Sequence, residues 1–103
     1  MSVWHKVMAL EALTRRSPQE AEAGRAALLL FEIEGVVYVT AAVCPHHATW
    51  LSQGGGERDR VSCPRHQGQF HIPTGHKLRG PQCPDLRTCE VEIRAGGIWV
   101  PVD

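Results

Sequence analysis

The chain has 103 residues, enough for one domain and too few for two. Its 11 basic and 11 acidic residues cancel, so the charge balance gives no reason to expect nucleic acid or a membrane surface as a partner. The 10 glycines and 7 prolines suit short strands joined by many turns.

The sequence carries no signal for export or membrane insertion. Residues 1–7 lack an apolar signal core, and the longest apolar run, 26–31, is too short to span a bilayer. We therefore expect a cytoplasmic protein, in which the 4 cysteines are metal ligands or free thiols rather than disulfides.

The N-terminal quarter contains one clear element and one ambiguous segment. Residues 3–7 predict a strand. Residues 9–24 fit either a short helix that starts at the capping box in 17–20 or a polar connection between strands.

The strongest secondary-structure signal is a hairpin. Residues 27–33 and 36–40 are rich in apolar, β-branched and aromatic side chains, and a Glu-Gly pair separates them. Because side chains alternate across a strand, Leu29, Phe31 and Ile33 share one face, which we expect to pack on the core.

The rest of the chain predicts further short strands between turns rich in glycine and proline. These strands are expected at 60–62, 70–72, 86–94 and 98–100. Such a pattern is typical of all-β proteins, so we predict a small antiparallel β-barrel or sandwich that forms a single domain over residues 1–103.

Two compact Cys/His pairs stand between the predicted strands. The first pair is Cys44 and His46, and the second is Cys63 and His66. Proline directly follows each cysteine and stiffens the loop. Two thiolates and two imidazoles side by side would make a four-ligand metal site.

Three interpretations of these pairs compete. A structural zinc site uses the same ligand types, although zinc fingers usually pair Cys with Cys and His with His. The residues could also bind nothing, but two paired motifs at this spacing argue against that reading. The third is a [2Fe–2S] cluster in which two histidines replace two cysteines on one iron.

The surrounding residues resemble the Rieske-type ferredoxins, and most of all the electron-carrier components of bacterial aromatic-ring dioxygenases such as the naphthalene and biphenyl systems. The residues that carry this resemblance are Cys44-Pro45-His46, Leu51-Ser52, Cys63-Pro64-Arg65-His66-Gln67-Gly68-Gln69-Phe70, Thr74-Gly75 and Gly80-Pro81.

The resemblance implies a cofactor, a ligand set and a fold. Cys44 and Cys63 would ligate one iron of a [2Fe–2S] cluster, and His46 and His66 the other. The resemblance further implies an antiparallel β domain in which a cluster-binding subdomain, about residues 43–84, forms one tip on a larger base. It places Gly80-Pro81 in a third loop that covers the cluster, and it leaves the neighbouring His47 without a ligand role.

High-potential members of this family carry extra groups around the cluster that are missing here. Thr49 and Arg65 stand where those proteins place disulfide-forming cysteines, and Gly68 and Phe70 stand where they place Ser and Tyr hydroxyls. Hydrogen bonds to the cluster sulfurs raise the potential, so we expect this chain at the low end of the Rieske range, about −150 mV.

The expected function is therefore electron transport and not catalysis. The chain would carry one electron from a flavin reductase to a terminal oxygenase, docking transiently at the cluster tip. One alternative is a Rieske-like small subunit of a reductase such as assimilatory nitrite reductase. Another is a zinc-binding interaction module.

The two remaining cysteines have ordinary explanations. Cys89 alternates with Val91 and Ile93 on the apolar face of a predicted strand, so we expect a core residue. Cys83 follows Gly80-Pro81, and we expect a packing role there. A disulfide between Cys83 and Cys89 is the less favoured alternative in a reducing compartment.

The half of the chain that carries the Cys/His pairs is net positive. Between Cys44 and Cys83 lie five basic residues and two acidic ones: Arg58, Arg60, Arg65, Lys77 and Arg79 against Glu57 and Asp59. This excess is either a solvated face or a surface that docks on an acidic partner, and docking would weaken as salt rises.

Overall fold

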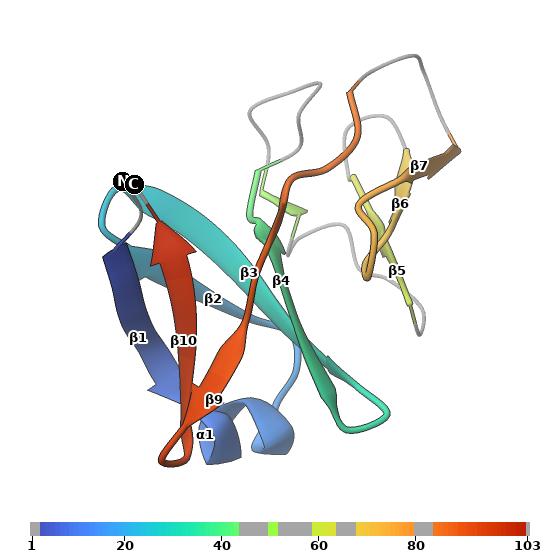
Figure 1. Cartoon of the computed structure of the whole chain (residues 1–103). Coiled ribbons are helices and arrows are strands. Elements are labelled where there is room, and N and C mark those ends of the chain that lie inside the picture. Colours follow the sequence, from blue (N-terminus) through green and yellow to red (C-terminus); the bar gives the residue numbers. More distant parts are fainter. Residues whose placement is uncertain (1–2, 44–49, 52–58, 64–67, 80–83, 103) are drawn as a thin grey trace.

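Antiparallel strands in three sheets make up most of the fold (Figure 1). A computed structural model describes residues 3–43, 50–51, 59–63, 68–79 and 84–102. The elements are β1 (Val3–Ala9), α1 (Leu10–Arg15), β2 (Gln19–Ala23), β3 (Ala26–Ile33), β4 (Val36–Ala41), β5 (Arg60–Ser62), β6 (Gln69–His71), β7 (Lys77–Arg79), β8 (Thr88–Cys89), β9 (Glu92–Arg94) and β10 (Gly97–Val102). The prediction of an all-β fold is confirmed, with one short helix added.

Two sheets build a basal unit, which consists of β1–β4 and β8–β10 with α1. One sheet has the order β1-β10-β9 and the other β2-β3-β4-β8. Between them lies an apolar core that includes Leu13, Leu28, Leu30, Ile98 and Val100, each at most 3% exposed. Burial of this apolar surface is the main source of stability for the basal unit.

The third sheet, β5-β6-β7, belongs to a distal unit made of the described residues between Val43 and Leu86. Figure 1 shows this sheet on the opposite side of β3 and β4 from β1 and β10. Its buried residues form a second core, in which Val61, Cys63 and Phe70 pack with Leu29 and Phe31 of β3.

Strand β3 is buried on both faces. Leu29 and Phe31 face the distal core, as the alternation predicted, but Leu28 and Leu30 are equally buried in the basal core. The expectation of a single core face was therefore incomplete, because the strand separates two cores instead of covering one. Continuous apolar sequence is the usual mark of a strand buried on both sides.

The structure of residues 9–24 matches neither of the two predictions, which were a short helix starting in 17–20 and a polar connection between strands. The helix α1 occupies Leu10–Arg15, before the capping box, and 19–23 is strand β2. The predicted helix start is wrong because β2 pairs with β3 from Gln19↔Leu30 to Ala23↔Ala26. Instead of capping a helix, the Ser17 hydroxyl accepts the backbone N–H of Glu32 at 2.9 Å.

The predicted strand over 86–94 is divided between the two basal sheets. Its first part, β8, pairs with β4, and its second part, β9, pairs with β10. Ile93 is consequently 46% exposed and does not join the core. No helix of the described residues is long and apolar enough to cross a membrane.

Candidate metal-cluster site

Cys63 is the one predicted ligand that lies among the described residues. It directly follows β5, and its side chain is 1% exposed in the distal core. It is a free thiol. The other three predicted ligands, Cys44, His46 and His66, lie outside the described residues.

The loop that contains the second Cys/His pair is closed at its base. Ser62 pairs with Gln69 at the end of the β5–β6 ladder, and the Cys63 N–H donates to the Gly68 carbonyl at 2.8 Å. The sequence places His66 between these two bonded residues. Backbone hydrogen bonds therefore close the base of this loop.

The loop that contains the first Cys/His pair is closed in the same way. Val43 and Trp50 form an antiparallel bridge, and the Leu51 N–H donates to the Ala42 carbonyl at 2.9 Å. Cys44 and His46 fall between the bridged residues in the sequence.

The bases of the two loops share one core. Ala42 and Leu51 from the first loop pack in the same buried cluster as Cys63 and Phe70 from the second. This shared core supports the expectation that the two Cys/His pairs lie side by side.

A third segment returns to the same core through Gly75 and Leu86. The Leu86 N–H donates to the Gly75 carbonyl at 2.8 Å, and the Gly75 N–H donates to the His71 carbonyl at 2.7 Å. Gly75 has a φ of +79°, and a Cβ there would overlap the carbonyl oxygen of Leu86. Only glycine suits both the backbone conformation and the close approach.

Asp85 joins the start of β7 to the segment that follows it. Its carboxylate accepts the backbone N–H of Lys77 at 3.0 Å and a hydrogen bond from His76 Nδ1 at 3.0 Å. The hydrogen bond from Lys77, and after it that from His76, lowers the pKa of the Asp85 carboxyl. The predicted covering loop, Gly80-Pro81, and Cys83 lie between these anchored residues but outside the described part of the chain.

Two histidines of the distal unit have partners that the sequence did not indicate. His71 Nε2 lies 3.2 Å from the Asp59 carboxylate, and its Nδ1 lies 2.9 Å from the Thr74 hydroxyl. His76 Nδ1 lies 3.0 Å from the Asp85 carboxylate, and its side chain remains 69% exposed. Folding of the chain brings each of these pairs together, and the spacing of the residues in the sequence does not indicate either pair.

The side chains around Cys63 fit a buried cluster ligand. Phe70 is 0% exposed in the same core, and neither it nor the buried Gly68 carries a hydroxyl. A free, buried thiol at the base of a closed loop has the chemistry of an iron–sulfur ligand, and the sequence places one histidine in each loop, His46 in the first and His66 in the second. The donor set predicted from the sequence therefore fits a [2Fe–2S] cluster with two thiolates and two imidazoles.

Comparisons with known proteins agree with this chemistry. A family model described as the Rieske [2Fe-2S] domain matches residues 3–90. The chain is 36% identical over 73 residues to the ferredoxin component of a naphthalene 1,2-dioxygenase system from Pseudomonas aeruginosa, which covers 71% of this chain and 70% of that protein.

Two solved structures are similar over almost the whole chain. A ferredoxin from Sphingomonas yanoikuyae B1 has a TM-score of 0.88 at 24% identity, covering 98% of this chain and 100% of its own, which is a likeness of fold. The ferredoxin in a complex of reduced oxygenase and oxidized ferredoxin of carbazole 1,9a-dioxygenase has a TM-score of 0.84 at 29% identity, covering 95% of this chain and 92% of its own.

Proposed function

This chain belongs to the Rieske [2Fe–2S] domain family, and we propose that it is the ferredoxin component of a bacterial aromatic-ring dioxygenase system. In this role it passes single electrons from a flavin reductase to a terminal ring-hydroxylating oxygenase. The observation that carries the proposal is the pair of closed loops on one core, each with one cysteine and one histidine.

The proposed ligands are Cys44 and Cys63 on one iron and His46 and His66 on the other. When bound, the cluster supplies a one-electron redox couple. The chain itself positions the Cys63 ligand and keeps water away from it. The Cys63 N–H is fixed to the Gly68 carbonyl, and Leu51 and Phe70, both 0% exposed, exclude water from the thiol.

A low potential follows from the residues around Cys63. Hydrogen bonds to cluster sulfurs stabilise the more negative, reduced state and so raise the potential. Phe70 packs beside Cys63 with carbon atoms alone, and Gly68 has no side chain to contribute. A carrier with a low redox potential suits an electron-transfer chain that runs from a flavin reductase to an oxygenase.

The partners proposed are a reductase and an oxygenase, and no substrate chemistry is assigned to this chain. The ferredoxin of the carbazole 1,9a-dioxygenase complex, which this chain resembles, is seen together with its oxygenase. We also propose a cytoplasmic location, where the thiols that would bind the cluster stay reduced.

We propose that partners dock at the cluster tip, and that the outer face of the β5-β6-β7 sheet next to the Cys63 loop contributes to the docking surface. Cross-strand pairing sets Arg60 opposite His71 and Gln69 opposite Arg79, and directly opposed residues share a face. Arg60 is only loosely paired, with 3.8 Å to Asp59. A partner with an acidic surface suits this face, and added salt should slow electron transfer to it.

Electron paramagnetic resonance of the reduced protein tests the proposed ligands. We expect a [2Fe–2S] signal whose mean g lies below that of all-cysteine ferredoxins, with hyperfine coupling to two imidazole nitrogens. A spectrum of the all-thiolate type would exclude histidine ligation, and a colourless protein that contains zinc would exclude the ferredoxin function itself.

A further inference from the structure

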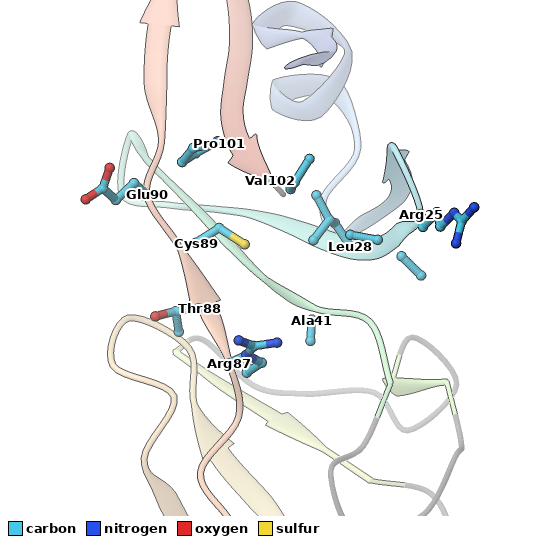
Figure 2. A pocket seen from close by; sticks show the side chains of 11 residues that line it. Arg25, Leu28, Ala41, Arg87, Thr88, Cys89, Glu90, Pro101 and Val102 are labelled. Carbon is cyan, nitrogen blue, oxygen red and sulfur yellow. The ribbon is translucent and has the colours of Figure 1, made fainter. Parts of the chain in front are cut away.

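A cavity of about 610 Å³ opens on the basal unit, and Cys63 is not among the residues that line it. It lies where the β2–β3 turn, the start of β8 and the end of β10 meet (Figure 2). Its lining residues are Arg25, Ala26, Ala27, Leu28, Ala41, Arg87, Thr88, Cys89, Glu90, Pro101 and Val102. The volume falls within the usual range for small-molecule sites, about 300–1,000 Å³.

Most of the lining is apolar. Ala41, Pro101 and Val102 present partly exposed apolar side chains, and Cys89 adds a half-buried thiol. Burial raises the pKa of the Cys89 thiol, and the positive charge of Arg87 opposes that rise. The cavity therefore offers an apolar surface to a ligand, with a cation close to that surface.

Arg87 gives the cavity its positive charge. Neither Arg87 nor Arg25 has an ion-pair or hydrogen-bond partner for its side chain among the residues that the structure describes. Figure 2 shows Arg87 below Cys89 and beside Ala41, whereas the Arg25 guanidinium at the other end and the Glu90 carboxylate are directed away from the other lining residues.

The backbone of Arg87 is fixed, which matters for recognition. Its carbonyl accepts the Ala41 N–H at 2.8 Å, and the next residue, Thr88, pairs with Thr40 on β4. The guanidinium therefore projects from a backbone position that hydrogen bonds to β4 hold directly before β8. A guanidinium on a fixed base can bind a carboxylate through two parallel hydrogen bonds.

We propose that this cavity binds a small organic carboxylate with an apolar body the size of one ring, its carboxylate on Arg87 and its body against Ala41, Pro101 and Val102. A fully apolar ligand would leave the Arg87 guanidinium unused, and a bare inorganic anion would leave the apolar wall unused. The proposal is independent of the electron-carrier function.

Titration calorimetry of the cluster-loaded protein with benzoate tests the proposal, with neutral benzamide as the matched ligand. We expect saturable binding of benzoate, with benzamide at least about tenfold weaker, because the charged contact is lost. Arg87→Gln should weaken benzoate binding about tenfold. The matched control Arg16→Gln removes an exposed arginine outside the cavity and should leave the affinity unchanged.

The reactivity of Cys89 gives a second readout. Benzoate should slow alkylation of Cys89 by iodoacetamide, followed on the Cys89 peptide by mass spectrometry, and this protection should disappear in Arg87→Gln. An unchanged visible spectrum of each variant shows that the fold and cluster are intact. The proposal is overturned by absence of benzoate binding, by equal affinity for benzamide or sulfate, or by an Arg87→Gln variant that binds benzoate normally.

Discussion

The basal and distal units achieve their structure by different means. In the basal unit, β1–β10 and β3–β4 each share six residue pairs and β2–β3 shares five, whereas in the distal unit β5–β6 shares three and β6–β7 two. Long ladders over a dedicated core sustain the basal unit. The distal unit has short ladders and single backbone hydrogen bonds at its loop bases. The proposed cluster would add to its stability.

The distal unit also depends on its neighbour for part of its core. Leu29 and Phe31, which complete the distal core, belong to β3. A small unit with short strands buries too little surface to be stable alone, and bound metal commonly supplies the missing free energy. We therefore expect the two units to respond differently to the same kind of damage.

Removal of a proposed ligand should produce the largest difference between the units. His66→Ala should abolish cluster assembly, because one iron would lose a ligand, while the basal unit stays folded. The measurements are iron content and hydrogen exchange, with loss of protection expected in β5–β7 and not in β3 or β10. The control, His47→Ala, should remain coloured, and the reverse result would show that the ligand assignment is wrong.

Replacing a glycine by alanine should destabilise the distal unit more than the basal unit. Gly75→Ala forces a side chain at φ +79° against the Leu86 carbonyl, whereas Gly35→Ala has φ +82° and nothing within 4 Å. We expect Gly35→Ala to cost about 1–2 kcal/mol from backbone strain alone. Gly75→Ala should cost about 3–5 kcal/mol, since hydrogen bonds at the base of the distal unit are also lost. Chemical denaturation measures both, and equal costs would contradict the close packing at Gly75.

Two neighbouring leucines on β3 probe the two cores separately. Leu29 and Leu30 are both 0% exposed but face different cores. Leu29→Ala and Leu30→Ala should each lower the free energy of unfolding by about 2–5 kcal/mol. Only Leu29→Ala should also speed the bleaching of the visible spectrum, because it loosens the core around Cys63. Equal bleaching rates would mean that the cores are not independent.

A hydroxyl placed in the distal core should change the redox potential and little else. Phe70→Tyr adds one possible donor beside Cys63. If it reaches a cluster sulfur, a hydrogen bond of about 1 kcal/mol corresponds to a rise of about 40 mV for one electron. Protein-film voltammetry measures the shift, with Tyr38→Phe in the neighbouring strand as a control. No shift would mean that the ring edge points away from the cluster.

Acid should weaken the distal unit slightly through Asp85. Its pKa is lowered in the folded state, so its contribution to stability is full above the unfolded pKa of about 4 and is lost as pH falls through the folded value. The difference in Tm between the wild type and Asp85→Asn should therefore shrink below about pH 4. A difference that stays constant with pH would show that the carboxylate charge plays no part.

The sequence was most informative where function depends on local spacing. The two Cys/His pairs, the β3–β4 hairpin and β5 follow from neighbouring residues, and the structure agrees at β3, β4 and β5. All four ligands remain predictions. Motif spacing and strand alternation are properties of a few consecutive residues, which explains this success.

The sequence was least informative where distant segments decide the outcome. Gln19-Glu20-Ala21-Glu22-Ala23 has no strong strand pattern and becomes β2 only because β3 offers a partner edge. The break between β8 and β9 likewise reflects a passage from one sheet to the other. The bond between His76 and Asp85 exists only once β7 has folded back.

The pairing of β4 with β8 has a further consequence. Val39 faces Cys89 and Thr40 faces Thr88, so the chain leaves the basal unit and returns to it at adjacent positions. The distal unit therefore has the geometry of a module inserted into a host domain. Because β4 and β8 already hold the two ends of the insertion together, a longer insertion costs little additional loop-closure entropy. The distal unit can therefore diverge in length and partner preference, or be exchanged between relatives, while the host remains the same. Such exchange is limited by the host side chains that pack in the distal core, Leu29 and Phe31 of β3 first among them, because every transplanted module would have to fit them.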